Sequence, residues 1–370
     1  MNILILTNIY PSDNSIKGTF IEEQAKALST QHQVFVFVFS INNKEFKPFK
    51  KYDLTEQTSK NLTIYRFTIF KTFPFLNQIK CFYYAAKVVK HKIINNKKID
   101  IIHSHFCYPS GLLGLFLKKN THIPLVITEH SSILEGQFRT FLHKIIVVKV
   151  LKKADVLIAV SKTLMQSMLK YVNRRIEIVP NVVDTSKFKL KVETTVPINI
   201  GFLGILNNHR KGLDLLIDAI SNIKYKNYIL HIGGEGKLLE YYKKFAKEKN
   251  IFHLCRFYGN IPYQEVPLFF SKIDIFVLPS RIESFGVVLL EAMACGIPVI
   301  ATICGGPEDF VTNKVGIIVK PNDSFAITEA IDKMIATYSN YDSLKIREYV
   351  ESNFGVAVLC NQLTNLYKRK

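Results

Sequence analysis

The 370-residue sequence lacks several features that would place it in a membrane or secreted class. It has no run of about 18 or more apolar residues. The longest candidate, Ile101–Leu117, is uncharged but contains histidine, proline and glycine, and so predicts a strand, a loop and a helix. The six cysteines form no C-x-x-C pair, which is typical of a protein with reduced thiols. Met1 leads into an apolar strand without a basic start or a cleavage site, so we expect a cytoplasmic protein.

Signatures of other functional classes are missing as well. No helix-turn-helix, RNP or zinc-finger pattern occurs, so only charge supports nucleic-acid binding, and we expect none. The cluster Gly233–Gly236 does not complete G-x-G-x-x-G and gives no support to NAD binding. His103 and His105 alternate along a predicted strand and could face one ion. No third ligand at a suitable spacing and no D-x-D pair accompany them, so we expect neither a metal nor another cofactor.

The formal net charge of +19 is distributed unevenly along the chain. Residues 1–185 hold 26 basic and 12 acidic side chains, a net charge of +14, whereas the remainder holds +5. Positive charge concentrated on one half of the chain favours an anionic partner, such as a membrane surface, an acidic glycan or nucleic acid. The alternative is that lysine, which is plentiful along the whole chain, only keeps the protein soluble.

Short apolar runs alternate with helical patterns from end to end, which is typical of an α/β fold. Val34–Phe39 is apolar at every position, as expected for a strand covered on both faces. The first half predicts seven strands, at Ile3–Leu6, Val34–Phe39, Leu62–Phe67, Ile99–His103, Leu125–Thr128, Val156–Val160 and Ile176–Val179.

The second half repeats the same plan. It predicts strands at Ile198–Leu203, Tyr228–Ile232, His253–Tyr258, Ile275–Leu278, Val299–Ala301 and Gly316–Val319. We therefore expect two doubly wound domains, 1–185 and 198–354, separated by a polar linker at 186–197. A last helix, 355–370, is expected to join the first domain. Ligands of such domains bind at the carboxyl ends of the strands.

The most informative stretch is PSRIESFGVVLLEAMACGIPVIAT, residues 279–302. Glu283 follows the apolar strand Ile275–Leu278, and Ser284 is placed to cap the helix that carries Glu291. The two carboxylates are separated by about 12 Å of helical rise, enough to hold the two ends of a sugar nucleotide. Main-chain N–H groups at Phe285–Val287 favour an anion at the helix N-terminus, where Gly286 has no side chain to block it.

This stretch resembles the E-x7-E region of retaining family 4 glycosyltransferases. The resemblance extends over essentially the whole chain and is strongest in residues 198–323. It implies the GT-B fold, in which two Rossmann-like domains face each other across a cleft. It also implies metal-independent transfer of a sugar from a nucleotide diphosphate with retention of configuration. Glu283 then matches the residue that binds hydroxyls of the donor sugar, and Glu291 the residue that binds those of the ribose.

The resemblance also assigns basic residues to the diphosphate. In GFLGILNNHRKG, residues 201–212, Lys211 matches the lysine that contacts the diphosphate, and Arg210 is its neighbour. The family usually has an arginine directly after the second glycine of this loop, where this chain has Ile205. Either Arg210 supplies the missing charge or the diphosphate is held less tightly. Stabilisation of the leaving diphosphate is the central requirement of the reaction.

Three further residues match the family at loops that follow predicted strands. Gly18 corresponds to the loop whose backbone approaches the donor phosphate, although many members have Gly-Gly where this chain has Lys17-Gly18. His130, in VITEHSS, corresponds to a histidine near the transferred sugar. Gly234 lies in a turn like the one under the nucleotide base.

Two stretches of the first half, 70–98 and 138–153, mix aromatic residues with lysines. Such helices can lie in an anionic bilayer interface, or they can be ordinary helices with an apolar core side and solvated lysines. The first reading predicts peripheral association with the inner face of the cytoplasmic membrane and a lipid-linked acceptor.

The function predicted is that of a retaining, hexosyltransferase-type glycosyltransferase, similar to bacterial enzymes of surface-polysaccharide or lipooligosaccharide biosynthesis. Its expected partners are a nucleotide-diphosphate sugar and a glycan or lipid-linked acceptor. Two alternatives share the fold, a nucleotide-sugar epimerase and a non-catalytic protein that binds sugar nucleotides.

Overall fold

The computed structural model describes residues 1–12, 17–46, 52–71, 77–132, 134–138, 140–191 and 196–369. Several sequence predictions therefore extend beyond the described residues: the loop before Gly18 at 13–16, the aromatic–lysine stretches at 72–76 and 139, and the linker at 192–195. The chain divides into two compact units. Unit 1 comprises Met1–Pro180 and Leu359–Lys370, and unit 2 comprises Asn181–Val358.

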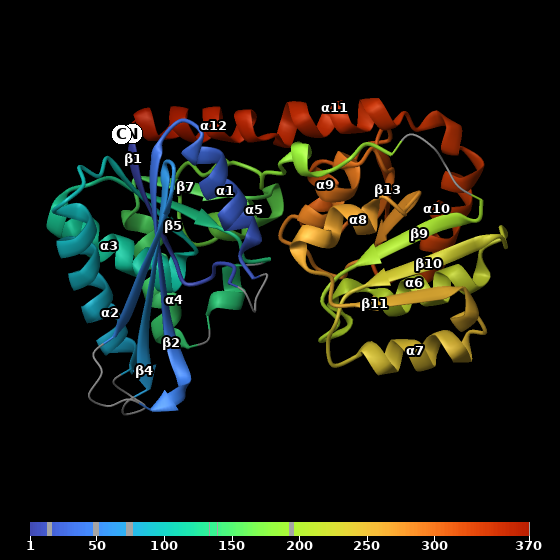
Figure 1. Ribbon diagram of the computed structural model, residues 1–370, viewed down its shortest axis with the longest axis horizontal. Helices are drawn as coiled ribbons and strands as arrows, with labels where there is room; N and C mark the ends of the chain where they lie inside the picture. Colours follow the sequence, from blue (N-terminus) through green and yellow to red (C-terminus); the bar gives the residue numbers. More distant parts are fainter. Residues whose placement is uncertain are drawn as a thin grey trace. The chain divides into compact units, whose positions relative to one another are not determined.

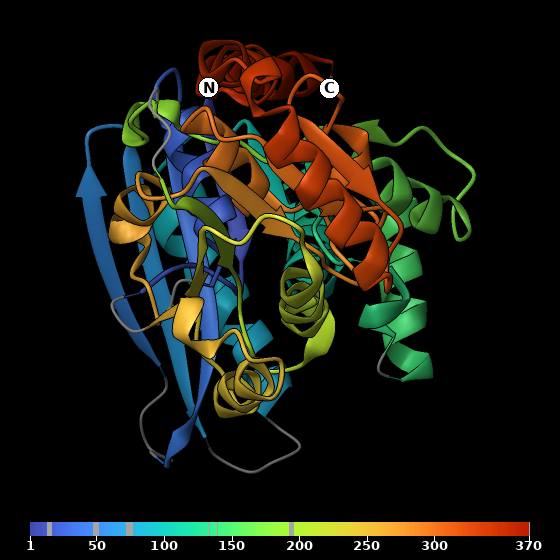
Figure 2. The same ribbon diagram turned by 90° about the vertical axis from the view of Figure 1, so that its right-hand side faces the viewer.

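Unit 1 contains an eight-stranded sheet among its described residues, in the order β3-β4-β2-β1-β5-β6-β7-β8 (Figure 1). All neighbouring strands are parallel except β3 and β4. The longest strands, β2 and β4, run side by side and are drawn in blue in Figure 2. The strands are β1 Asn2–Thr7, β2 Gln33–Phe46, β3 Asp53–Ser59, β4 Leu62–Lys71, β5 Ile101–His105, β6 Leu125–Glu129, β7 Val156–Ala159 and β8 Glu177–Ile178.

The strand β3 was not predicted from the sequence. Its residues DLTEQTS are mostly polar and lie at the edge of the sheet, where they are largely exposed. A strand of this kind has no apolar run or strict alternation to mark it, because neither of its faces is buried. The predicted strand at Ile99–His103 is also wrong at its boundaries, since β5 begins at Ile101 and continues to His105.

Helices cover both faces of the unit 1 sheet. Successive strand residues point to opposite faces, and in β5 the side chain of Ser104 lies beside Gly114 of α3 whereas His103 binds Tyr367 of α12. The face with α3 also carries α2 and α4, since α2 contacts α3 and α3 contacts α4. The helices are α1 Thr19–Ser29, α2 Asn77–Val88 continued by a π-helical segment Val89–Ile94, α3 Leu112–Thr121, α4 Phe141–Lys153, α5 Lys162–Leu169 and α12 Val356–Lys368.

Unit 2 is built on a six-stranded, all-parallel sheet in the order β11-β10-β9-β12-β13-β14. Figure 1 shows β9, β10 and β11 in adjacent positions. The strands are β9 Ile198–Leu203, β10 Tyr228–Gly233, β11 Cys255–Gly259, β12 Ile275–Leu278, β13 Val299–Thr302 and β14 Gly316–Val319. The helices are α6 Leu213–Asn222, α7 Leu239–Glu248, α8 Val266–Phe270, α9 Val287–Ala294, α10 Ser324–Ala336 and α11 Ser343–Phe354.

Both sheets have the doubly wound order, and the predicted α/β class with two parallel-sheet domains is confirmed. In unit 2 the chain runs outward from β9 through β10 to β11 and then returns to β12 on the other side of β9. In unit 1 the same reversal separates β1 from β5. At such a switch point the loops on the two sides diverge and leave room for a ligand at the carboxyl ends of the strands.

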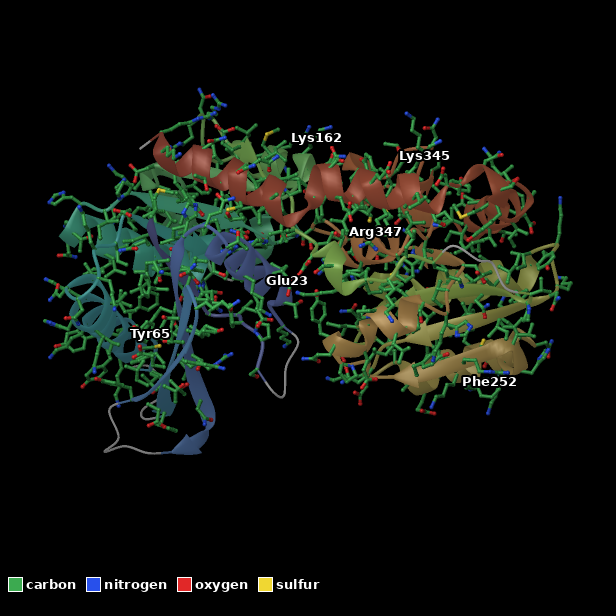
Figure 3. All side chains as sticks on the ribbon, turned by 45° about the horizontal axis from the view of Figure 1, so that its top comes forward. Glu23, Tyr65, Lys162, Phe252, Lys345 and Arg347 are labelled. Atoms are coloured by element: carbon green, nitrogen blue, oxygen red, sulfur yellow. The ribbon has the colours of Figure 1, made fainter. Side chains whose placement is uncertain are left out.

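The chain changes from unit 1 to unit 2 earlier than the predicted boundary at 185, because residues 181–191 are tied to unit 2. The guanidinium of Arg347 on α11, labelled in Figure 3, donates hydrogen bonds to the carbonyls of Thr185 (2.9 Å) and Phe188 (2.6 Å). The N–H of Lys191 donates to the carbonyl of Cys295 (2.8 Å). A segment held by these bonds is part of a folded unit, so residues 186–191 of the predicted linker belong to unit 2 and do not separate the two units.

The last helix, predicted at 355–370, is α12, and from Leu359 onward it belongs to unit 1. In the described part of the chain, each helix is too short or too polar to span a lipid bilayer. The hydroxyl of Tyr367 is hydrogen-bonded to Nδ1 of buried His103 (2.6 Å), and this contact connects α12 to β5.

We predict that Tyr367→Phe lowers the free energy of unfolding of unit 1 by about 1–3 kcal/mol, because it leaves the buried Nδ1 of His103 without its partner. Urea denaturation followed by circular dichroism measures the change. Tyr83→Phe is a matched control, because the Tyr83 side chain is 61% exposed. Equal stability of the two variants would contradict the assignment of this contact.

Candidate active site

The site in unit 2 is formed by loops that follow adjacent parallel strands. The loop after β9 carries Arg210 and Lys211, and the loop after β12 carries Glu283. Since β9 and β12 flank the switch point, these loops emerge together at the carboxyl edge of the sheet. The structure therefore brings together the basic pair and the first of the two predicted glutamates.

A close ion pair joins the two loops. Nζ of Lys211 lies 2.5 Å from Oε1 of Glu283, although the residues are 72 positions apart. The hydroxyl of Ser280 donates to the same oxygen at 2.7 Å, and the N–H of Glu283 donates to the carbonyl of Cys304 at 3.0 Å. Glu283 is only 6% exposed. A buried carboxylate is tolerated when it is paired and hydrogen-bonded in this way.

A second ion pair holds the basic loop in place. The guanidinium of Arg281 makes two bonds to the carboxylate of Asp214, at 2.9 and 2.7 Å, and a third to the carbonyl of His209. The N–H of Arg281 also donates to the carbonyl of Arg210. Nε of Arg210 donates to the carbonyl of Ile282 at 2.9 Å. The loop with Lys211 is thus fastened to the loop with Glu283 along its length.

Two glycines permit the close packing of these loops. Gly212 has φ +72°, and a Cβ there would lie 2.0 Å from the carbonyl oxygen of Pro279. Gly234 has φ +134°, and a Cβ there would lie 1.9 Å from the carbonyl oxygen of Gly204. Backbone in this conformation, pressed against a neighbouring loop, admits only glycine. Gly234 therefore lies against the β9 loop, beside the predicted phosphate site.

The start of α9 differs from the sequence prediction. The helix begins at Val287 and its N-cap is Gly286, at φ +94°, with no side-chain cap, so the expected capping by Ser284 is wrong. Glycine takes the position because the left-handed conformation there disfavours serine. The side chain of Phe285 is buried against Phe310, with ring centroids 4.8 Å apart, so only its main chain can bind a ligand.

The second predicted glutamate, Glu291, lies on α9 and is 7% exposed. Ile205, at the position where an arginine was expected, has a side chain 49% exposed, so a longer basic residue would also fit there.

Sequence reasoning missed Ser280, Arg281, Asp214 and Glu308 in this region. Glu308 accepts hydrogen bonds from the N–H groups of Cys304 and Gly305 and so orders the loop after β13. A signal for Ser280 was available, since serine three positions before Glu283 in a tight turn can reach its carboxylate. Nothing local in the sequence pairs Arg281 with Asp214, because they come from different strand–helix units.

The remaining predicted residues, Gly18 and His130, lie in unit 1. Gly18 is the N-cap of α1, with φ +87°, and a Cβ there would lie 2.7 Å from the carbonyl oxygen of Ile9. This packing brings the start of α1 against the loop after β1. The ring of Phe20, two residues later, lies 4.6 Å from the ring of His130. Gly18 and His130 thus belong to one neighbourhood of unit 1.

His130 directly follows β6 and is 6% exposed. Its Nε2 lies 2.8 Å from Nδ1 of His105, and its ring contacts Phe106 at a centroid distance of 5.3 Å. Burial lowers the pKa of His130 to about 3 and, with the neighbouring His103 and His130, lowers that of His105 well below its usual value. Both rings are therefore neutral at physiological pH.

A buried glutamate that the sequence analysis missed fixes the backbone around His130. The carboxylate of Glu129 accepts the N–H groups of His130 and Ser131 through Oε1, both at 2.9 Å. Its Oε2 accepts the N–H of Cys107, also at 2.9 Å. One side chain thus joins the loop after β6 to the loop after β5. In the sequence, Glu129 is visible only as a polar residue that follows the predicted strand Leu125–Thr128.

His103 and His105, which were considered as metal ligands, form hydrogen bonds to other side chains. Both ring nitrogens of His103 are hydrogen-bonded, Nδ1 to Tyr367 at 2.6 Å and Nε2 to Thr128 at 2.7 Å. The rings of His103 and His105 stack at 4.7 Å. Within the described ranges, no group of three or more His, Cys, Asp or Glu side chains is arranged to hold a metal ion.

Comparison with known proteins agrees with this architecture. The profile "Glycosyltransferase Family 4" matches residues 18–187, and "Glycosyl transferases group 1" matches residues 184–350. An uncharacterised glycosyltransferase of Methanocaldococcus jannaschii is 30% identical over 286 residues, which cover 73% of this chain and 76% of that protein. The chain belongs to the family 4 glycosyltransferases.

Two further relatives extend the comparison. TuaC of Bacillus subtilis, named for teichuronic acid biosynthesis, is 26% identical to this glycosyltransferase over 367 residues, covering 90% and 89% of the two chains. The structure of HepE from Anabaena superposes with a TM-score of 0.77 at 17% identity and covers 100% of each chain. This structural likeness identifies the fold, and it agrees with the predicted GT-B architecture.

We predict that the glycosyltransferase loses stability in mild acid because burial lowers the pKa of His103 and His130 to about 3, and that of His105 well below its usual value. In the unfolded chain these groups titrate near pH 6.5, so the unfolded state binds more protons below that pH. The contribution of these neutral histidines to the free energy of unfolding is fully present above about pH 6.5. Below that pH it falls by about 1.4 kcal/mol for each histidine and each pH unit. Urea denaturation at about pH 7.5, 6.5 and 5.5 measures the slope.

The replacement His103→Gln tests the cause of this acid sensitivity. It removes one of four imidazoles whose pKa burial lowers strongly, because His231, with a pKa of about 4, also contributes. The slope of the free energy of unfolding against pH should therefore fall by about one quarter. A wild-type stability that does not change over this pH range would contradict the prediction.

Proposed function

We propose that this glycosyltransferase moves a sugar from a nucleotide-diphosphate sugar to a glycan or lipid-linked acceptor, with retention of configuration. The observation that carries the proposal is the Lys211–Glu283 ion pair at the switch point of the unit 2 sheet. The pair supports the proposal because a lysine can stabilise a leaving diphosphate and the neighbouring carboxylate can accept hydrogen bonds from sugar hydroxyls.

The roles follow from the chemistry of each group. Lys211 and Arg210 bind the diphosphate, which replaces the carboxylate as the partner of Lys211 when the donor enters. Glu283 is then available to accept hydrogen bonds from sugar hydroxyls. Glu291 accepts those of the ribose, and the main chain at Phe285–Val287 contacts the anion near the N-terminus of α9.

Three residues complete this assignment. We assign Gly234 to the turn beneath the nucleotide base and Gly18 to a backbone approach to the donor phosphate. His130 is assigned to the transferred sugar. No metal is part of the proposal, because lysine and arginine side chains supply the positive charge that the departing diphosphate requires.

The nature of donor and acceptor is supported by relatives. HepE was solved in complex with UDP and glucose, and TuaC is named for the biosynthesis of teichuronic acid. We therefore propose a nucleotide-diphosphate hexose as donor and a growing surface polysaccharide as acceptor. UDP-glucose is the first donor to test.

We predict that Glu283→Ala lowers the rate of transfer by about 100-fold or more, the usual cost of a lost polar contact to the transition state. Binding of the bare nucleotide diphosphate should stay within about threefold, or tighten, because the change releases Lys211 from its carboxylate partner. Glu291→Ala should instead weaken that binding about tenfold. Calorimetry with UDP and a transfer assay measure the two quantities.

The exposed Glu240, also in unit 2, provides the control variant Glu240→Ala, which should change neither quantity. Full transfer activity of Glu283→Ala would refute the assignment. Formation of an epimerised nucleotide sugar without acceptor would identify an epimerase, and UDP binding without transfer or hydrolysis would identify a binding protein. Loss of transfer in EDTA, restored by Mg²⁺, would contradict the metal-independent mechanism.

We also propose that unit 1 docks on an anionic membrane surface, which would bring the enzyme to a lipid-linked acceptor. The docking face consists of six apolar side chains on the neighbouring helices α2, α3 and α4, each between 48% and 78% exposed. They are Ile79, Tyr83, Phe116, Phe141, Leu142 and Ile145.

Positive charge surrounds the docking face. The helices α2, α3 and α4 and the π-helical turn after α2 contain no aspartate or glutamate. They carry exposed lysines at positions 87, 90, 92, 119, 144, 149, 152 and 153. Exposed apolar side chains on helices whose charged residues are all basic are complementary to the interface of an anionic bilayer, where apolar groups enter and lysines bind headgroups.

We predict that the protein sediments with phosphatidylglycerol vesicles at low salt, is released at high salt and ignores phosphatidylcholine vesicles. Each lysine at such a surface contributes about 1 kcal/mol and is screened by salt. Changing Lys80, Lys87, Lys90 and Lys92 together to Glu should abolish sedimentation and leave UDP affinity intact.

The matched control places the same four charge reversals on unit 2, at the exposed Lys224, Lys237, Lys244 and Lys345. It should retain most of its vesicle binding. Equal loss in both quadruple variants would mean that net charge alone is responsible, and absence of wild-type sedimentation would refute the docking proposal.

A further inference from the structure

The pair formed by His105 and His130 leaves two ring nitrogens buried without a partner. Nδ1 of His105 and Nε2 of His130 share one hydrogen bond of 2.8 Å. The other nitrogens, Nε2 of His105 and Nδ1 of His130, have no hydrogen-bond partner among the described residues. An unpartnered polar atom in a buried position calls for an explanation, and a bound ligand is one.

Counting protons restricts the pair to two arrangements. Each neutral imidazole carries one N–H, and the shared bond uses one of the two protons. If His105 donates from Nδ1, then His130 carries its proton on Nδ1, outside the pair. If His130 donates from Nε2, then His105 carries its proton on Nε2. Both rings therefore adopt the same tautomer, either Nδ1–H or Nε2–H.

The surroundings of the two rings favour the first arrangement. His105 is fully buried, and its ring lies between those of His103 and His130, at 4.7 and 5.1 Å. An N–H on its Nε2 would be a donor enclosed without an acceptor, which is rarer and more costly than an enclosed lone pair. Nδ1 of His130 is buried as well, but His130 lies at the end of β6, keeps 6% of its surface exposed and contacts the substrate in the proposed function, so it is the ring whose N–H a ligand would pair.

We propose that His105 is a positioning residue that donates from Nδ1 to Nε2 of His130 and thereby holds His130 as an Nδ1–H donor toward a hydroxyl or phosphate oxygen of the bound substrate. The proposal rests on the proposed function, in which His130 contacts the transferred sugar. It adds which atom of His130 acts, in which direction its hydrogen bond points, and which residue enforces that direction.

The backbone between the two histidines is built to keep this geometry. Phe106, which directly follows His105, has φ +71°, a conformation that is strained for a residue with a side chain. The centroid of its ring lies 5.3 Å from that of His130, whose ring also contacts Phe20 at the start of α1. Glu129 fastens the N–H of Cys107 and that of His130 to one carboxylate. The imidazole of His130 is thus confined by neighbours on both loops.

The tautomers can be read directly from the protein labelled with ¹⁵N-histidine. In a long-range ¹H–¹⁵N correlation spectrum, the protonated and bare nitrogens of each ring have different shifts and coupling patterns. The wild type should show both His105 and His130 as Nδ1–H tautomers, with assignments from His105→Asn and His130→Gln. Finding both rings as Nε2–H tautomers would overturn the proposal. This result does not depend on activity, so it is separate from failure of the proposed function.

Kinetics of two variants of similar size provide the functional comparison. His105→Asn retains an amide N–H near the position of Nδ1 and should keep kcat within about tenfold of the wild type. His105→Asp offers only acceptor atoms, draws the proton of His130 to Nε2, and should lower kcat about 100-fold or more. UDP affinity should be unchanged in both. Equal rates for the Asn and Asp variants would overturn the proposal, and the wild-type spectrum decides it if His105→Asp does not fold.

Discussion

Parallel pairing of β9 with β12 is the constraint on which the unit 2 site depends. The pairing of Ile275 with Ile200 and of Phe276 with Gly201 sets the height at which both strands end. The loops that follow must then share the same edge of the sheet, and Lys211 and Glu283 meet there. A buried ion pair of this kind contributes little net stability by itself, because desolvation offsets the attraction. Its value is that it orders two loops and keeps a cation and a carboxylate ready for a ligand.

The ion pairs at the unit 2 site differ in charge from the buried histidines of unit 1. In unit 2 the site is charged, with Lys211, Glu283 and the Arg281–Asp214 pair all in contact with partners of opposite sign. In unit 1 the histidines around β5 and β6 are buried and neutral, since burial lowers the pKa of His103 and His130 to about 3.

The proposed docking face and the predicted site residues occupy different elements of unit 1. His105 and His130 belong to β5 and the loop after β6, whereas the exposed apolar side chains belong to α2, α3 and α4. In β5, alternate residues serve the two layers: Ser104 lies beside α3, and His103 binds α12. One sheet can therefore support a helical layer suited to a bilayer surface while its strand ends carry polar chemistry.

Local patterns in the sequence were sufficient to predict most of the scaffold. Runs such as Val34–Phe39 and Ile275–Leu278 are apolar throughout, because parallel strands are covered on both faces, so their positions can be read without a structure. The predicted site residues also follow strands in the structure, because ligand-binding loops of doubly wound sheets begin where strands end. The edge strand β3 was missed since its exposed, polar residues carry no burial pattern.

Side-chain partnerships, in contrast, were decided only by the tertiary structure. The sequence by itself determined that Glu283, Lys211 and His130 follow strands. Only folding decided that Lys211 binds Glu283, that Asp214 holds Arg281, and that His105 binds His130. These contacts join residues from separate strands, and their geometry depends on strand order and register. Neither is encoded in any short segment, because both result from the packing of the whole sheet.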